Sequence, residues 1–497
     1  MRVNKLKFPS KVQVPSRLRL QLLYQFMAVN SRKILTFWAD GEWRQRVRNL
    51  VRVPKGEASV PLDVLRLALP ATAEQMLSMM VGIVDTFLVG HLGAASLAAV
   101  GLASQWIFLA YTLLGATATG STALIARFIG AKEREQANRV VRQSVWLGAL
   151  IGLGCSLLGV ALARPGVLLL GAKAEVVSLS TSYLRIVAGF LFFSSLMFIG
   201  NACMRGAGDT RTPLYIMLVV NLVNISVAWT TINGLLGLPK LGVVGSALGA
   251  ASGQLVGGLL VLVSLWKGRS GIRLNLAGFR PDWGLIHRVL RIGLPTGVEQ
   301  VFFRTGNMAY VRILATLGIA AYAANQVAIN SWSLSFMPGF GFAIAATTLV
   351  GQSLGAQDPD GAQRRGFTTY WMGAGLMALV GLSFVFFPTQ IMGFFTNDQE
   401  VIHLGALPLR IMGVFQPILA ASMIFTGGLR GAGDTRYPMV VTAGGIWLVR
   451  LPLAYLFAIG LGWGLTGAWS AMAIDLTIRA VLNFLRFRSG RWKTIAV

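Results

Sequence analysis

Long apolar segments alternate with short polar turns from residue 65 to residue 485. A helix that crosses a bilayer needs roughly 20 mainly apolar residues, and each segment is at least that long. The pattern therefore predicts twelve transmembrane helices and an all-α integral membrane protein. The predicted helices cover residues 65–90, 94–125, 139–163, 174–204, 213–236, 241–266, 286–314, 318–350, 366–388, 398–427, 437–460 and 464–485.

The second six segments repeat the first six at one offset. The stretch VLRLALPATAEQ at 64–75 returns as VLRIGLPTGVEQ at 289–300, and RGAGDTR occurs at 205–211 and again at 430–436. Six crossings return each half to its starting side, so the halves should share their topology about an axis along the membrane normal. Such repeats place a substrate cavity at their interface and allow alternating access by rocking of one half against the other.

These patterns divide the chain into five parts. The first 60 residues contain many Lys and Arg, few acids and no apolar run long enough to span a membrane, which fits a basic tail, a late start codon at Met27 or a targeting segment. The predicted parts are a basic cytoplasmic N-terminal leader at 1–63, an N-lobe of helices 1–6 at 64–266, a cytoplasmic linker loop at 267–284, a C-lobe of helices 7–12 at 285–487, and a cytoplasmic tail at 488–497.

Positive charge is distributed unevenly between the two sides of the predicted bundle. The chain has 44 Lys and Arg against 18 Asp and Glu, and one side has only Arg164, Lys173 and Lys240. Because Lys and Arg accumulate in cytoplasmic turns, both termini should be cytoplasmic in a multi-pass protein of the cell membrane. Basic residues do not alternate with aromatic residues on a soluble segment, so we expect no nucleic-acid partner.

Motifs for catalysis and metal binding are missing from the sequence. GxxxxGK[ST] does not occur, and no Ser-His-Asp or paired-acid constellation is present. Cys155 and Cys203 lie in apolar segments, and His91, His287 and His403 lie at segment ends without forming a cluster. We therefore expect no enzyme, no catalytic residue, no metal and no cofactor, and an ion gradient or a separate subunit must supply energy.

The first predicted helix contains two acids, Glu74 and Asp85. Eleven residues are about three helical turns, so both acids point from nearly the same face. An ionisable group inside a membrane normally marks a pathway, a coupling site or an ion pair. Pro70 removes a backbone donor four residues before Glu74 and should kink or loosen the helix. This helix is the predicted moving part.

Pro295 and Glu299 occupy the repeat positions of Pro70 and Glu74. Two interpretations of the glutamates stay open: they satisfy backbone donors freed at the proline, or they face a cationic substrate in the cavity. Arg304 is costly in lipid, so it should line the cavity of the second half or pair with an acid.

Two further polar features have structural interpretations. Asp475 and Arg479 are four residues apart in the favourable order for an ion pair on one helix. The two RGAGDTR segments lie at helix junctions, where Asp209 and Asp434 should act as helix N-caps.

Several motifs resemble the multidrug and toxic compound extrusion (MATE) transporters over residues 64–487. They are GIVDTFLVGHLG at 82–93, ARFIGAKE at 126–133 with its echo VGQSLGAQD at 350–358, both RGAGDTR segments, NLVNI at 221–225 and LGVVGSALG at 241–249. The resemblance implies export of small organic, often cationic, compounds in exchange for H+ or Na+.

The chain is most similar to the DNA-damage-inducible (DinF-type) branch of that family. The resemblance implies that Asp85 and Asn224 couple to the ion, with Asp85 protonated from outside while the first helix bends at its proline. The aspartate usual four residues after Asn224 is replaced by Ala228, and the acid of the seventh span stands early, at Glu299, rather than near Phe303 or Arg304. These departures favour H+ over Na+ as the coupling ion.

The resulting prediction is a multidrug efflux antiporter that acts as a monomer in the lipid bilayer. One alternative is a lipid-linked saccharide flippase of the same superfamily, whose cavity would be richer in arginine. An alternative of another class is a multi-span membrane enzyme or channel, which would need a catalytic cluster or a continuous polar stripe.

Overall fold

The computed structural model describes residues 59–495 apart from 236, 238, 269 and 276–278. The predicted leader up to residue 58 therefore lies outside the described residues. The first described helix, α3, begins at Val60. The helices of the first half are α3 (Val60–Gly90), α4 (Ala94–Gly130), α5 (Arg134–Ala161), α6 (Ala163–Leu169), α7 (Ala174–Gly189), α8 (Leu191–Gly206), α9 (Arg211–Asn233) and α10 (Val243–Trp266).

The second half follows the same plan. Several of its helices begin at side-chain caps: Asp282 precedes α11, Asp358 precedes α14 and Asp398 precedes α16. The helices are α11 (Trp283–Ala315), α12 (Ile319–Ser333), α13 (Phe336–Gly355), α14 (Pro359–Phe386), α15 (Pro388–Gly393), α16 (Gln399–Val414), α17 (Gln416–Gly431), α18 (Arg436–Gly444), η2 (Gly445–Arg450), α19 (Leu451–Tyr455), η3 (Leu456–Gly460), α20 (Gly464–Arg488) and η4 (Arg491–Thr494).

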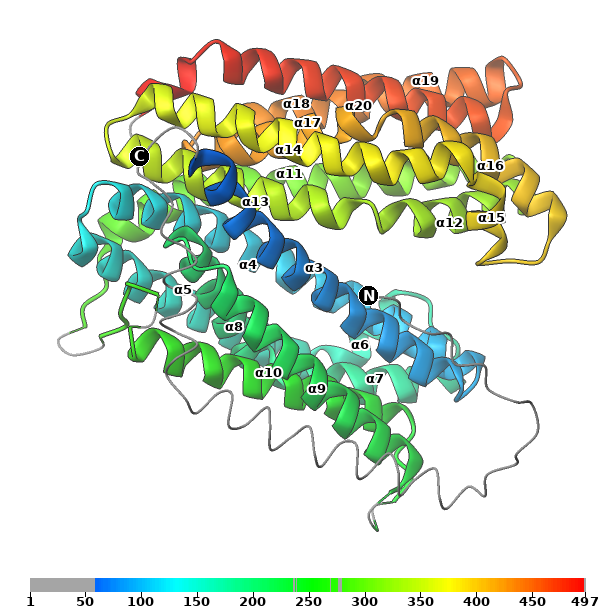
Figure 1. The fold of residues 1–497 in the computed structure, drawn as a ribbon. Coiled ribbons are helices and arrows are strands. Elements are labelled where there is room, and N and C mark those ends of the chain that lie inside the picture. The colour runs from blue at the N-terminus through cyan, green and yellow to red at the C-terminus, as the bar shows by residue number, and fades with distance from the viewer. Residues whose placement is uncertain (1–58, 236, 238, 269, 276–278, 496–497) are drawn as a thin grey trace, which may run out of the picture. The chain divides into compact units, whose positions relative to one another are not determined.

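The described helices confirm an all-α protein with many membrane spans (Figure 1). Eight helical spans are long and apolar enough to cross a membrane, and three bent helix pairs raise the number to 11. The helix α11 has 33 residues, but Glu299, Arg304 and Arg312 interrupt its apolar stretch. Counting α11 as well gives twelve candidate spans among the described residues, at the places where the sequence predicts segments.

Three of the predicted spans are bent where the sequence pattern suggests one continuous helix. The pairs α7–α8 and α16–α17 bend by 51° and 55° at the repeat-equivalent residues Phe190 and Phe415. The pair α12–α13 bends by 44°, whereas its repeat partner α4 is continuous. Pro338 lies near the start of α13 and cannot donate a backbone hydrogen bond to Leu334. Apolar length alone does not show these bends.

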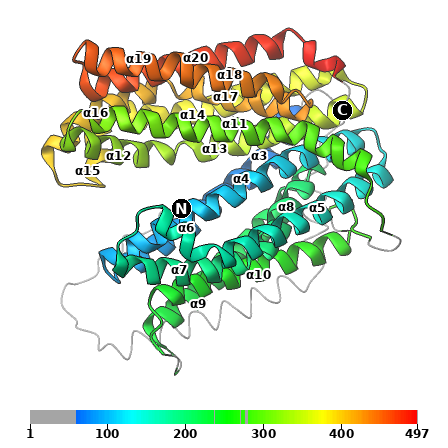
Figure 2. The ribbon, with the colours of Figure 1, turned by 180° about the vertical axis from the view of Figure 1, so that it is seen from behind.

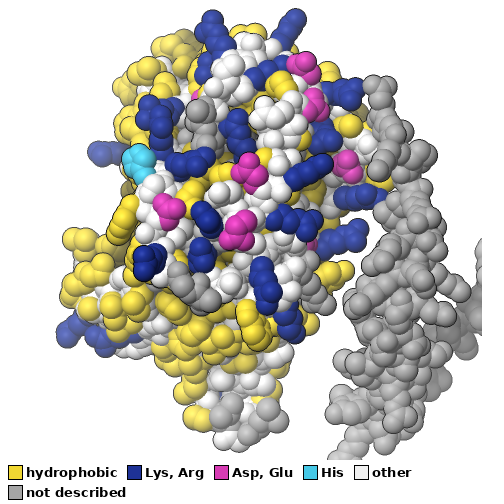
Figure 3. Space-filling model, turned by 90° about the vertical axis from the view of Figure 1, so that its left-hand side faces the viewer, with side chains coloured by type: hydrophobic (Ala, Val, Ile, Leu, Met, Phe, Trp, Pro, Cys, Tyr) yellow, Lys and Arg dark blue, Asp and Glu magenta, His cyan; other side chains and the backbone are white. Residues whose placement is uncertain are grey.

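Lys and Arg side chains gather at one end of the bundle, which we call the basic end (Figure 3). These residues lie where helices begin or finish. The opposite end has fewer basic residues among those described, with Arg164, Lys173, Lys240 and Arg312 in the last turn of α11. The members of the basic end are Arg127, Lys132, Arg205, Arg211, Arg288, Arg291, Arg364, Arg430, Arg436, Arg486, Arg488 and Lys493.

The two halves exchange the first turns of their first helices at the basic end. Val64, Leu67 and Ala68 of α3 pack into the apolar core of the second half. Their repeat partners Val289 and Ile292 of α11 pack into the core of the first half. Figures 1 and 2 show α3 leaving the second-half helices at this end and diverging from them toward the other end. This exchange interlocks the halves.

Close backbone contacts join α4 to α13 beside the exchanged helices. A Cβ added at Gly130 would collide with the Gln352 carbonyl oxygen, and one added at Gly355 would collide with the Arg127 carbonyl oxygen. The pairs are equivalent under the 225-residue repeat. Glycine therefore permits a symmetric approach of two backbones that any other residue would hold apart.

Substituting Gly130 or Gly355 by alanine should weaken the contact between the halves at the basic end. Overpacking costs about 1–3 kcal/mol, which corresponds to a shift of roughly 5- to 150-fold toward a conformation with an open basic end. The measurement is the alkylation rate of a single cysteine at Ser353, which is 1% exposed, in a Cys155→Ser, Cys203→Ala background.

The matched control is Gly115→Ala on the same helix, because a Cβ there meets no atom within 4 Å. Alkylation should accelerate in the Gly130 and Gly355 variants and stay unchanged in the control. Equal rates in all of these proteins would show that the glycine contact does not hold the halves together.

Candidate functional site

Asp85 and Asn224, which the family resemblance assigns to ion coupling, come together inside the first half. Asp85 lies on α3 and is 7% exposed, and Asn224 lies on α9 and is 1% exposed. The Asn224 side chain lies beside the Asp85 carboxyl group and interacts with it. Tyr183 of α7 lies close enough to interact electrostatically with the same carboxyl group. Three helices of one half therefore position this acid.

The polar groups around Asp85 are incompletely paired. Oδ1 of Asp85 and Oδ1 of Asn224 are buried and have no hydrogen-bond partner among the described residues. On α9, Ala228 is fully buried and packs in an apolar cluster with Leu88, at the position where the family resemblance would place a second acid. The described residues also contain no group of three or more His, Cys, Asp or Glu side chains that could hold a metal. The site can accept a proton or a cation at one carboxylate.

Glu74 and Glu299 each form an ion pair with the first arginine of a RGAGDTR segment. Glu74 Oε1 lies 2.7 Å from Arg205 Nη1, and Glu299 Oε2 lies 2.7 Å from Arg430 Nη2. Thr442 also donates to Glu299 at 2.9 Å. Glu299 is the repeat partner of Glu74, and Arg430 is the repeat partner of Arg205. This equivalence is visible in the sequence and is the signal that could have pointed to the two arginines as partners of the glutamates.

These ion pairs add a third interpretation of the glutamates to the two drawn from the sequence. Both carboxylates bind arginines from α8 and α17, and Oε2 of Glu74 has no hydrogen-bond partner among the described residues. Both α3 and α11 continue without interruption through Pro70 and Pro295. The arginine partners across the bundle are not part of either interpretation drawn from the sequence.

The Arg205 segment also connects the two halves. Thr348 Oγ1 of α13 donates to the Arg205 carbonyl oxygen at 2.9 Å, and Gln352 Nε2 donates to the Gly206 carbonyl oxygen at 3.3 Å. The Glu74–Arg205 pair thus fixes the helix end that receives the second half.

Arg304 contacts an aromatic ring instead of an acid. Its guanidinium carbon lies 3.4 Å from the centroid of the Phe108 ring on α4, and the residue is exposed. No ion pair of Arg304 is present among the described residues. A cation over an aromatic face is stabilised by the ring quadrupole, so Arg304 adds a contact between α11 and the first half.

The predicted Asp475–Arg479 ion pair is confirmed and is part of a larger buried network. Asp475 Oδ2 lies 2.9 Å from Arg479 Nη2 and 2.7 Å from Arg450 Nη2. Arg450 belongs to the π-helical turn η2 and also donates to Asn307 Oδ1 at 3.3 Å. The sequence pattern does not reveal Arg450, because a single arginine inside an apolar segment has no periodic signal.

The match to a known protein family occurs twice, once in each half of the internal repeat. The family model described as MatE matches residues 70–230 and again residues 295–456. The two matches begin 225 residues apart and together cover more than half of the chain. The chain belongs to the MatE family of transporters. The resemblance read from the motifs is therefore confirmed at the level of the family, which is a transporter family and not a family of enzymes.

Full-length relatives and solved structures agree with this assignment. The probable multidrug resistance protein NorM of Thermotoga maritima is 34% identical over 90% of this chain and 96% of its own. The multidrug resistance protein NorM of Burkholderia vietnamiensis is 30% identical over 86% and 93%. A structure described as the outward-facing conformation of a multidrug resistance MATE family transporter superposes with a TM-score of 0.82 at 24% identity, over 88% of this chain and 97% of that one. This likeness shows the MATE fold.

Replacing Arg205 by methionine should destabilise the MatE-family fold because Glu74 would remain buried without a partner. Breaking a buried ion pair costs about 3–5 kcal/mol, whereas replacing both partners by apolar residues is often nearly neutral. The double variant Glu74→Leu, Arg205→Met should therefore recover most of the loss. The measurement is the free energy of unfolding in mixed micelles titrated with sodium dodecyl sulfate.

The control is Arg66→Met, which removes the more exposed Asp63–Arg66 pair at 3.9 Å and should cost less than about 1 kcal/mol. A double variant as unstable as Arg205→Met alone would contradict the assignment of Glu74 as the partner of Arg205.

Proposed function

We propose that this protein is a secondary active multidrug efflux antiporter that exports organic, often cationic, compounds in exchange for H+. The observation that carries the proposal is Asp85, a buried acid on a membrane-spanning helix with one unpaired carboxylate oxygen and Asn224 beside it. An ionisable group in such a place is costly unless it binds and releases a proton or ion. The names of the relatives, multidrug resistance proteins, support organic compounds as the exported class.

One feature favours a proton as the coupling ion and the DNA-damage-inducible (DinF-type) branch as the closer functional model. At position 228, where the resemblance would place a second carboxylate, the chain has a buried alanine. Hard cations prefer several oxygen ligands, whereas a proton needs one carboxylate. Sodium is the competitor, supported by the unpaired Oδ1 atoms of Asp85 and Asn224.

Alternating access follows from the place of Pro70 on α3. The turns from Val64 to Ala68 are packed into the second half, and Asp85 lies on the other side of Pro70. A proline inside a helix removes one backbone hydrogen bond and lowers the resistance to bending. Protonation of Asp85 then bends the part of α3 beyond Pro70, while the turns that the halves exchange stay packed. In a later step the N-lobe (64–266) and the C-lobe (285–487) rock apart at the basic end.

The basic end is the cytoplasmic end in this proposal. Lys and Arg accumulate there, which by the positive-inside tendency places both termini and the linker at 267–284 in the cytoplasm. The transporter acts as a monomer in the cell membrane in this proposal, since both lobes of the internal repeat belong to one chain.

Replacing Asp85 by asparagine should abolish proton-driven export, because an amide cannot exchange a proton. The measurement is transport of a fluorescent organic cation in proteoliposomes, with proton and sodium gradients imposed separately. Export by Asp85→Asn should fall to the level of empty liposomes, while Asp85→Glu, which keeps a titratable group, retains part of the activity.

Export driven by sodium alone would contradict the proton assignment and leave the family assignment intact. A wild-type protein that moves no organic cation under either gradient, with Asp85→Asn behaving identically, would contradict drug export and direct the next assay to lipid-linked saccharides.

A further inference from the structure

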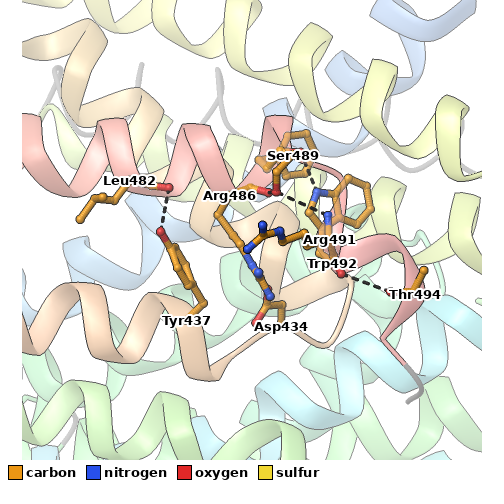
Figure 4. A network of polar contacts seen from close by, with 9 residues as sticks. Asp434, Tyr437, Leu482, Arg486, Ser489, Arg491, Trp492 and Thr494 are labelled. Carbon is orange, nitrogen blue, oxygen red and sulfur yellow. Dashed lines mark hydrogen bonds and ion pairs between the residues drawn. The ribbon is translucent and has the colours of Figure 1, made fainter.

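The chain turns back on itself after α20 and packs against the second half. Residues 489–495, which we call the tail segment, reverse direction at Gly490, whose φ of 70° lies in the left-handed region that favours glycine. Trp492 is fully buried and stacks on Phe487 of α20, with 4.7 Å between the ring centroids. Its Nε1 donates to the Phe487 carbonyl oxygen at 2.7 Å (Figure 4). Trp492 therefore anchors the tail segment in the second half.

Ion pairs hold the tail segment and the helix end before it on the same half. Arg486 Nε donates to Asp434 Oδ2 at 2.8 Å (Figure 4), and Lys493 Nζ lies 2.8 Å from Asp360 Oδ1. The prediction that Asp434 is a helix N-cap is wrong: no side chain caps the start of α18, because the Asp434 carboxylate pairs with Arg486. Asp360 is largely exposed, so the pair with Lys493 stabilises the tail segment less than the burial of Trp492 does.

Beyond Trp492 the tail segment reaches the first half. Arg127 Nη1 of α4 donates to the Ile495 carbonyl oxygen at 3.0 Å. The Ile495 side chain packs against the apolar cluster that contains Trp492. Arg127 lies in the last turn of α4, where its own carbonyl oxygen faces Gly355 of α13. Both halves therefore hold the tail segment, beside the close backbone contact that joins them.

The chain after α10, the repeat partner of α20, is held by its own half. Ser270 Oγ donates to Asp209 Oδ2 at 2.6 Å, and the Arg273 backbone N–H donates to Asn138 Oδ1 of α5 at 2.7 Å. Asp209 Oδ1 also accepts the first backbone N–H groups of α9 at 3.0 and 2.9 Å, so the predicted capping by its side chain is present. Ser270 and Arg273 thus bind within the first half, whereas Ile495 binds across the two halves.

We propose that the tail segment is a latch that holds the basic end closed. Trp492 fixes the latch in the second half, and Arg127 of the first half binds its Ile495 carbonyl oxygen. Because this donor and this acceptor belong to different halves, opening of the basic end must break their hydrogen bond or pull Trp492 out of its apolar cluster. Release of the tail segment therefore favours the open conformation.

The latch rests on one part of the proposed function, the separation of the halves at the basic end. It does not depend on the coupling ion or on the exported compound. Its strength sets how often the basic end opens, and the coupling site at Asp85 takes no part in it.

The test measures opening directly, with spin labels at the exposed residues Glu133 and Ala356 of the full-length protein in a Cys155→Ser, Cys203→Ala background. The readout is the ratio of long to short distances between the labels. Arg127→Met and Trp492→Ala should each raise this ratio about fivefold, the effect of losing one hydrogen bond. The double variant should raise it no further, because both substitutions release the same segment.

The matched control is Ser270→Ala, which breaks a contact within the first half and should leave the ratio unchanged. Gly130→Ala shows that the labels detect opening, and Arg127→Met alone carries the test if Trp492→Ala does not fold. An increase for Gly130→Ala without one for Arg127→Met would overturn the latch and leave opening at the basic end intact. Fully additive effects of Arg127→Met and Trp492→Ala would also overturn it, since they would then act independently. An unchanged ratio in every variant, Gly130→Ala included, would overturn both the latch and the proposed opening.

Discussion

The exchange of α3 and α11 at the basic end is the constraint on which the rest of the structure depends. The first turns of each helix complete the apolar core of the other half, with Val64 and Val289 in equivalent places. Within a membrane the hydrophobic effect does not drive helices together, so close packing and polar contacts must do so. Gly130 and Gly355 provide the close packing, and the hydrogen bonds from Thr348 and Gln352 provide the polar contacts. The remainder of each half can then diverge without losing the connection.

Charges inside the bundle follow the repeat where they hold the structure and depart from it where the halves differ in role. The pairs Glu74–Arg205 and Glu299–Arg430 are symmetric and fix helix ends in both halves. Asp85 has no counterpart in this arrangement, and the second half has instead the buried Arg450–Asp475–Arg479 network. The first half thus contains a buried acid, Asp85, for which no ion pair is present among the described residues, while the buried Asp475 of the second half binds two arginines.

The sequence predicts the number of spans, the repeat and the charged end, because each leaves a periodic or repeated signal. Asp85 and Asn224 leave no such signal and are assigned to one site only through the family resemblance. The sequence does not predict the bends at Phe190 and Phe415, since a bent apolar helix has the same composition as a straight one. It also does not distinguish Asp209, whose carboxylate accepts the first backbone N–H groups of α9, from Asp434, whose carboxylate pairs with Arg486 instead. Their segments are identical, and the difference arises from Arg486, which lies far along the chain and meets only Asp434. Contacts between distant helices determine such roles.

The central claim is that the halves are interlocked at the basic end and must separate there during transport. The most direct measurement is the distance between spin labels at Glu133 and Ala356, exposed residues next to the ends of α4 and α13, in a doubly labelled protein that still transports. The account predicts one short distance in the conformation described here. It predicts a second, longer distance when protonation of Asp85 or the Asp85→Asn substitution shifts the equilibrium toward a conformation with an open basic end. A single unchanged distance under every condition, with transport intact, would contradict it.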